Sequence, residues 1–385
     1  MADASRGTGR LESLDVLRGF DMFFIFLPDP VPCIVVTFLA MFGLEHSAFA
    51  LQFDHCAWNG LRFYDCIFPL FLFISGVTFP FSYARQRAHG FGTGRIVGRI
   101  LRRAAMLFLL GAMLWTVIDG TLEKNVLSFE WEHFRVWSVI GRIGLAWGAA
   151  ALLFVAFGRK TRIGIAVAIL VAMWMVFRFA VAPGAPAGVN PLVDREWMWA
   201  NWVDVNYLTT AHRPEGGFST ITMVATAMFG NFAGEILLGV DDRCRCTKVV
   251  RLLLFAALLL ACGLLMAFGF GGWSLPVNKP VWSSSFALVA GGISAALLAL
   301  FHWVVDVRGW RRWGFFFKVI GMNAITIYLL MRTVFNWGFE SQYFFGGICG
   351  LLPPAVGAFV MQAGMIAIGW LFLYWLYKKG LFLRV

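Results

Sequence analysis

The residues best suited to chemistry lie between Asp54 and Asp65, where a polar segment ends and an apolar one begins. A histidine such as His55 titrates near neutral pH, so it can take a proton from a nucleophile and return it to a leaving group. The carboxylate of Asp65, Asp29 or Asp54 could hold the imidazole tautomer. The alternative is that His55 only caps or packs at a membrane interface while Asp65 pairs with Arg62.

Two further charged residues fall inside apolar runs. Asp29 lies between Pro28 and Pro30, and Arg142 has no acidic residue one helical turn away. Charges inside membrane segments usually face a cavity, and a buried arginine needs a partner. We therefore expect Arg142 to pair across helices or with a ligand. Asp29 either faces a cavity or bonds the backbone groups that the prolines free.

The composition indicates that these residues are carried by a membrane protein. Apolar residues make up 60% of the 385 residues and charged residues 14%, whereas soluble domains have about 45–50% and about 25%. Long apolar runs favour helices, because an outer-membrane barrel would show short alternating segments. We predict an all-α polytopic membrane bundle with a single domain over residues 1–385.

Ten apolar segments have about the 20 residues that a membrane-spanning helix needs. The expected spans are 14–40, 61–83, 96–118, 136–157, 162–181, 218–239, 249–270, 281–305, 314–337 and 355–377. The first is broken at Pro28–Pro30, because proline removes a backbone donor and kinks a helix. A broken helix at membrane depth must pack in protein or line a wet cavity.

The charge distribution predicts the orientation. The net charge is +11, and the positive residues gather at the ends of alternate apolar runs, which is a topology signal rather than a sign of nucleic-acid binding. We expect both termini to be cytoplasmic. His55 then lies on the outer side. The seven cysteines contain no CxxC pair, so neither a disulfide framework nor a metal site is predicted.

A series of motifs runs through the chain in a fixed order. The blocks are Ser13–Phe20 (SLDVLRGF), His55–Gly60 with Asp65 and Phe68–Val77 (HCAWNG…D…FPLFLFISGV), Arg102–Arg103, Arg142–Ile143, Pro214–Gly216 with Ser219–Thr220, Asn278–Lys279 with Trp282 and Ser285, and Gly321–Ala324. Together they resemble the heparan-α-glucosaminide N-acetyltransferase family and its bacterial relatives, over about residues 11–377. The resemblance implies a place in a bacterial cytoplasmic (inner) membrane.

The resemblance implies a dimeric, multi-span acyltransferase that moves an acetyl group from cytosolic acetyl-CoA to the amine of a glucosamine across the membrane. It places the family's catalytic histidine on His55 and its acidic residue on Asp65, and Asp29 stands where the family has asparagine. On this basis the expected acetyl-CoA site comprises Arg18, Arg102, Arg103, Arg142, Ser219 and Asn323. The expected sugar site comprises Asp29, Trp58, Asn59, Glu215, Asn278, Lys279 and Trp282.

Two mechanisms and one rival function fit this pattern. CoA phosphates would bind the arginines of the Arg85–Arg103 loop, and the pantetheine arm would enter the bundle. His55 would act as general base on the acceptor amine or carry the acetyl group itself. The rival is an aminosugar transporter, in which Asp29, Arg142 and Asn323 line a passage and His55 relays protons. The expected partners are acetyl-CoA, an aminosugar, membrane lipid and a second copy of the chain.

Overall fold

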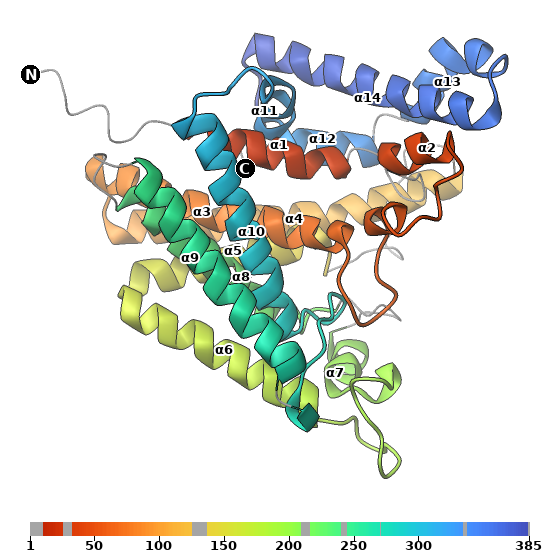
Figure 1. The fold of residues 1–385 in the computed structure, drawn as a ribbon. Coiled ribbons are helices and arrows are strands. Elements are labelled where there is room, and N and C mark those ends of the chain that lie inside the picture. The colour runs from red at the N-terminus through yellow and green to blue at the C-terminus, as the bar shows by residue number, and fades with distance from the viewer. Residues whose placement is uncertain are drawn as a thin grey trace, which may run out of the picture.

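The computed structural model describes residues 11–25, 33–124, 137–208, 216–239, 245–269, 271–333 and 337–383, and these are almost entirely helical (Figure 1). The helices are α1 (Glu12–Phe24), α2 (Ile34–Ala40), α3 (Ile67–Ala88), α4 (Thr93–Lys124), α5 (Val139–Ala156), α6 (Arg159–Phe179), α7 (Trp199–Tyr207), α8 (Thr220–Leu238), α9 (Arg245–Leu264), α10 (Ser284–Phe301), α11 (Phe315–Met322), α12 (Ala324–Thr333), α13 (Trp337–Cys349) and α14 (Pro354–Lys379). Across these ranges the only β pairing is an isolated bridge between Val181 and Met198.

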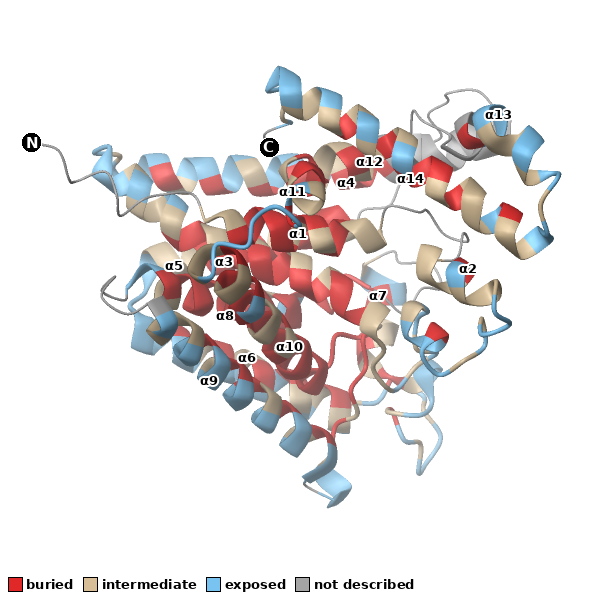
Figure 2. Ribbon diagram, turned by 45° about the horizontal axis from the view of Figure 1, so that its top comes forward, coloured by how far each residue is buried: buried red, intermediate tan, exposed pale blue. Residues whose placement is uncertain are grey.

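Seven helical segments of the described chain are long and apolar enough to cross a membrane, which confirms the predicted all-α membrane bundle. They are Phe63–Ala88, Val139–Ala156, Arg159–Phe179, Thr220–Leu238, Cys246–Gly269, Ser284–Val307 and Pro354–Lys379. Each coincides with one of the ten predicted spans. The outer helices α6 and α9 expose most of their side chains, whereas α3, α8 and α10 are buried along most of their length (Figure 2). An apolar exposed face of this kind suits contact with lipid.

The other three predicted spans have different forms. The run 14–40 contains the two helices α1 and α2, and the predicted break at Pro28–Pro30, with Asp29, lies outside the described residues. The run 314–337 is not one continuous helix, because α11 ends before Asn323 and α12 begins after it. The run 96–118 lies within the 32-residue helix α4.

Close backbone contact between α3 and α8 forms the centre of the bundle. Gly230 and Gly234 of α8 are four residues apart, and a Cβ at either position would overlap a carbonyl group of α3, at Phe73 and Val77 respectively. Small residues at this spacing allow membrane helices to approach until their backbones touch. This contact fixes α3, which passes through the middle of the molecule (Figure 1).

A second glycine contact joins the first and last motifs of the sequence. A Cβ on Gly19 of α1 would overlap the carbonyl of Phe317, and a Cβ on Gly321 of α11 would overlap the carbonyl of Asp15. The glycines of these two motifs therefore have a packing role. Their contact holds α1 against α11 and so positions Arg18, which follows Asp15 by three residues.

The helix α3 and the short 3₁₀ turn Phe63–Cys66 before it connect two polar regions. Asp65 lies in the turn, and Arg85 lies near the opposite end of the helix. Twenty residues at 1.5 Å per residue span about 30 Å, which is about the apolar thickness of a bilayer. The region around Asp65 and the region around Arg85 therefore lie at opposite ends of the bundle.

The glycine contact between α3 and α8 gives a first prediction. Gly230→Ala should destabilise the protein by about 1–3 kcal/mol, because the added methyl group forces two packed backbones apart. The exposed Gly164 of α6 has open space around its Cα, so Gly164→Ala should leave stability unchanged or raise it by up to about 1 kcal/mol through helix propensity. Thermal unfolding midpoints in detergent test this; equal midpoints for the two variants would contradict the packing role.

Candidate active site

His55, Asp65 and Lys279 meet in one cluster at the N-terminal end of α3. His55 Nδ1 lies 2.9 Å from Asp65 Oδ1. Lys279 Nζ lies 3.0 Å from His55 Nδ1, 3.3 Å from Nε2 and 3.5 Å from Asp65 Oδ1. The His55 side chain is 46% exposed and that of Asp65 only 1%. An accessible imidazole thus lies against an enclosed carboxylate and an enclosed ammonium group.

The Asp65 carboxylate is held by several donors. Its Oδ2 accepts hydrogen bonds from the backbone N–H groups of Cys56, at 3.2 Å, and Arg62, at 3.1 Å. When Nδ1–H of His55 donates to Oδ1, the lone pair of the neutral imidazole is on Nε2, as a general base requires. The guanidinium of Arg62 contacts Asp54 and the carbonyl of His55 instead.

The turn that carries Lys279 is docked onto the loop that carries His55. The Asn278 side chain donates to Asn59 Oδ1 at 3.0 Å and accepts from the backbone N–H of Val281 at 3.1 Å. The backbone N–H of Gly60 donates to the carbonyl of Val277 at 2.7 Å. Asn59 and Asn278, which were predicted to bind sugar, therefore use these amide groups to hold the two segments together.

Trp282 belongs to the same turn and anchors it in the bundle. It is 1% exposed, its φ of 52° is in the left-handed region, and its indole N–H donates to Thr226 Oγ1 at 3.1 Å. A residue other than glycine adopts this φ at an energetic cost, which the surrounding contacts must offset. The ring packs edge-on against Phe68, with 4.8 Å between centroids. Trp282 is thus enclosed by protein rather than presented at the mouth beside His55.

The segment before α7 covers the His55 loop, and sequence reasoning did not single it out. Trp58 Nε1 donates to the carbonyl of Leu192 at 3.1 Å. Arg195 donates to the carbonyl of Ala57 at 2.7 Å, and its guanidinium lies 4.1 Å from the centre of the Trp58 ring. The only sequence signal was a polar stretch between two spans, and polar stretches are common in outer loops.

Arg142 lies deeper in the bundle, at the start of α5. It is 2% exposed, donates to Ser219 Oγ at 3.2 Å, and stands 5.4 Å from the centre of the Phe68 ring. Ser219 in turn donates to the carbonyl of Gly216 at 2.7 Å. Nearby, burial raises the pKa of Asp204, and the charge of Arg142 and a hydrogen bond from the Phe218 N–H oppose that rise. Arg142 therefore pairs across helices, as its position in an apolar run predicted.

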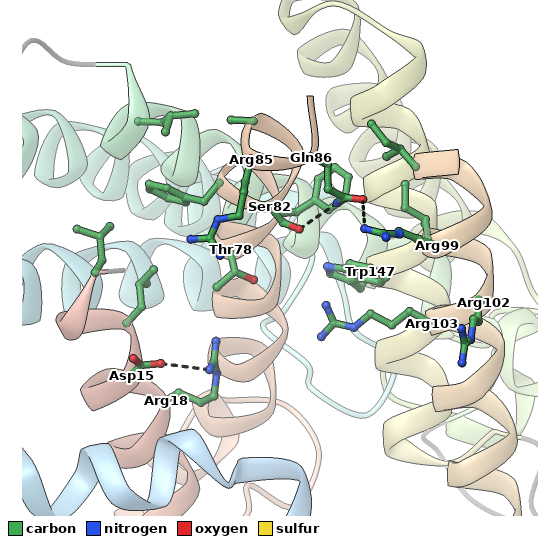
Figure 3. Close-up of a pocket in the computed structure, with 18 of the residues that line it drawn as sticks. Asp15, Arg18, Thr78, Ser82, Arg85, Gln86, Arg99, Arg102, Arg103 and Trp147 are labelled. Carbon is green, nitrogen blue, oxygen red and sulfur yellow. Dashed lines mark hydrogen bonds and ion pairs between the residues drawn. The ribbon is translucent and has the colours of Figure 1, made fainter. Parts of the chain in front are cut away.

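A large cavity opens at the other end of α3 (Figure 3), with a volume of about 880 Å³. Its described lining includes five arginines, Arg18, Arg85, Arg99, Arg102 and Arg103, and one carboxylate, Asp15. Arg18 and Arg103 extend into the space from α1 and α4 and repel each other electrostatically. Such a lining attracts anions with several oxygen atoms, because a guanidinium binds phosphate through paired hydrogen bonds.

The helices around this cavity correct one expectation. The Arg85–Arg103 segment was expected to be a loop, but it consists of the end of α3, a short turn, and the first turns of α4. Arg103 is directed inward, its guanidinium lies 4.3 Å from the centre of the Trp147 ring, and its Nε has no hydrogen-bond partner among the described residues. Helical backbone gives these arginines fixed positions that a loop would not.

A narrower cavity of about 370 Å³ continues from the first one toward His55. The two cavities adjoin each other, because six residues line both of them: Arg18, Thr78, Phe79, Ser82, Arg103 and Trp147. The second follows α3 with a largely apolar lining as far as Phe68, three residues from Asp65. Together the two cavities form a passage from the arginine-rich end to Phe68, whose ring packs against Trp282 close to the His55 cluster.

The remaining predicted residues lie in different places. Arg102 is exposed at the rim of the large cavity. Asn323 is 2% exposed, its side-chain N–H donates to the carbonyl of Val319, and its Oδ1 has no hydrogen-bond partner among the described residues. Asp29 and Glu215 lie outside the described residues. No group of three or more metal-ligating side chains occurs within the described ranges.

Comparison with known proteins identifies relatives. No protein-family model matches the chain. Heparan-alpha-glucosaminide N-acetyltransferase of Mus musculus is 26% identical over 385 residues, covering 86% of this chain and 56% of the mouse protein. The Homo sapiens protein of the same name is 25% identical over 376 residues, covering 83% of this chain and 52% of its own length.

The chain thus spans about half the length of the curated relatives it matches. The matches extend over most of the described helices, so they agree with a resemblance first based on separate motifs. Together the motifs, the membrane helices and these matches support a family relationship with the heparan-alpha-glucosaminide N-acetyltransferases.

Proposed function

We propose that the chain is a transmembrane acetyltransferase that moves an acetyl group from acetyl-CoA to the amine of glucosamine or a related aminosugar. The passage from the arginine-rich cavity to Phe68, close to the paired His55 and Asp65, is the observation that carries this proposal. The names of the two relatives support the reaction class. A donor and an acceptor entering from opposite ends of α3 would meet at this point.

The two cavities suit the two parts of the donor. The phosphates of CoA would bind at the wide end, where Arg18 and Arg103 project into the space. The uncharged pantetheine arm would occupy the narrow cavity, which is lined by residues such as Phe71 and Ile143. A ligand with an anionic head and an apolar arm matches a site whose lining changes from cationic to apolar in the same direction.

His55 would act as the general base on the acceptor. An amine attacks a thioester only through its free lone pair, so it must lose a proton before or during the attack. With Nδ1–H donated to Asp65, the lone pair on Nε2 of His55, 3.3 Å from the Lys279 ammonium, would take that proton. Asp65, enclosed and hydrogen-bonded, would position the ring without touching the substrate.

The proposed orientation of the protein in the membrane follows from its charge pattern. The arginine-rich end would face the cytoplasm of a bacterium and the His55 end the outer side of its inner membrane, following the positive-inside rule. Both termini would be cytoplasmic. The functional unit would be a homodimer embedded in lipid, as the resemblance implies.

A first test of the function replaces the imidazole. His55→Ala should lower acetyl-CoA-dependent acetylation of glucosamine by about 100- to 10,000-fold, because general-base catalysis is lost. His46→Ala is the matched control, since His46 is an exposed histidine of the same outer segment. The measurement is acetylated glucosamine formed and CoA released by purified protein in liposomes.

Three outcomes of that test would contradict the proposal. Retained activity in His55→Ala would show that His55 is not the general base. Labelled acetyl recovered on His55 after rapid quenching without acceptor would replace direct transfer with an acetyl-histidine route. Uptake of glucosamine by the wild-type protein without CoA release would favour the transporter.

The donor site makes a separate prediction. Arg103→Gln should weaken CoA binding by about 10- to 150-fold, since one charge-assisted phosphate contact contributes about 1.5–3 kcal/mol. Binding of pantetheine, which lacks the phosphates, should be nearly unchanged. Isothermal titration in detergent measures both.

Arg251→Gln is the control for this experiment, because Arg251 is exposed on α9 and does not line either cavity. Equal losses for CoA and pantetheine in Arg103→Gln would indicate a disturbed fold instead of a lost phosphate contact. Equal losses in the two variants would mean that only the overall charge matters.

A further inference from the structure

Lys279 is enclosed beside the proposed general base, and general-base catalysis gives it no role. Its Nζ lies 3.0 Å from His55 Nδ1, 3.3 Å from Nε2, the atom proposed to take the proton, and 3.5 Å from Asp65 Oδ1. The residue is 9% exposed. A cation that is removed from water and fixed near a reacting atom has a stronger electrostatic effect than one in solvent.

The donors of Lys279 are directed by the neighbouring contacts. An ammonium group has three N–H donors. One faces the Asp65 carboxylate, and His55 Nδ1 has no lone pair to accept another when its own proton is donated to Asp65. A second N–H can donate to the lone pair on Nε2, 3.3 Å away, which leaves the third N–H for a ligand beside that atom.

The position of Lys279 is rigid. The preceding Asn278 is hydrogen-bonded to Asn59 and Val281, and the backbone N–H of Trp282 donates to the carbonyl of Lys279 itself at 2.9 Å. Preorganised donors of this kind stabilise a developing charge without reorganisation during the reaction.

Resting on the proposed function, we propose that Lys279 is a catalytic residue whose ammonium group stabilises the oxyanion formed when the acetyl carbonyl is attacked beside His55. The amine nitrogen forms a bond to the carbonyl carbon, the π electron pair moves to oxygen, and Nε2 takes the amine proton. The C=O bond then re-forms, the C–S bond breaks with its electrons going to sulfur, and Nε2 returns the proton to give the CoA thiol.

Two other oxyanion donors are less suited. The Ser219 hydroxyl already donates to the carbonyl of Gly216. The Asn323 amide donates one N–H to the carbonyl of Val319, and Asn323 lines neither cavity. The same ammonium would serve if His55 were itself acetylated, because Nε2 would then attack the acetyl carbonyl and the negative charge would form on the carbonyl oxygen beside that nitrogen.

The test compares Lys279→Met with Lys279→Arg in purified protein, with acetyl-CoA and glucosamine as substrates. Lys279→Met should lower kcat by about 100- to 1,000-fold, the usual loss for one oxyanion donor. The KM for acetyl-CoA, the affinity for CoA and the thermal midpoint should change little. Lys279→Arg, which keeps a cation with N–H donors, should recover at least tenfold of the lost kcat. The matched control is Lys160→Met, an exposed lysine at the start of α6.

The outcomes separate this inference from the proposed function. Full kcat in Lys279→Met, or a loss confined to KM or to CoA affinity, would overturn the role of Lys279 while leaving the acetyltransferase intact. An equal loss of kcat in the Met and Arg variants would also overturn it, because the charge would then not matter. A wild-type protein that releases no CoA would overturn both proposals.

Discussion

The carboxylate of Asp65 is enclosed by protein, and the arrangement of the rest of the site depends on this. A charged oxygen pair removed from water is expensive unless donors surround it. Here two backbone N–H groups, an imidazole and an ammonium supply them. The loop before α3 and the turn before α10 must therefore both converge on this one group, and the imidazole is oriented as a result.

Convergence of this kind needs a rigid frame. The helix α3 begins next to the carboxylate and ends at the arginine-rich cavity, and its contact with α8 leaves no room for a side chain at Gly230. The passage follows the same helix along its length. One helix thus sets the distance between the two ends of the site, and its neighbours supply the walls.

The sequence predicted the all-α membrane fold and seven of the spans well, because apolar length alone identifies such helices. It also brought His55, Asp65 and Lys279 to notice as motif residues. It did not predict that Asn278 and Asn59 bind each other, or that Arg195 covers Trp58. Contacts between residues more than a hundred positions apart leave no periodic signal. The role of motif glycines such as Gly19 and Gly321 was likewise ambiguous in the sequence. Glycine suits both close helix packing and close approach to a ligand, and the structure shows the packing contact.

The aromatic layer at the inner end of the passage has a consequence for the membrane itself. Phe68 rests edge-on against Trp282 and beneath the guanidinium of Arg142. A protein that admitted reactants from two compartments through an open duct would let ions leak between them. These two rings would block the flow of ions between the compartments while the acetyl group is transferred. The positive charge of Arg142 beside them would also repel protons and metal cations.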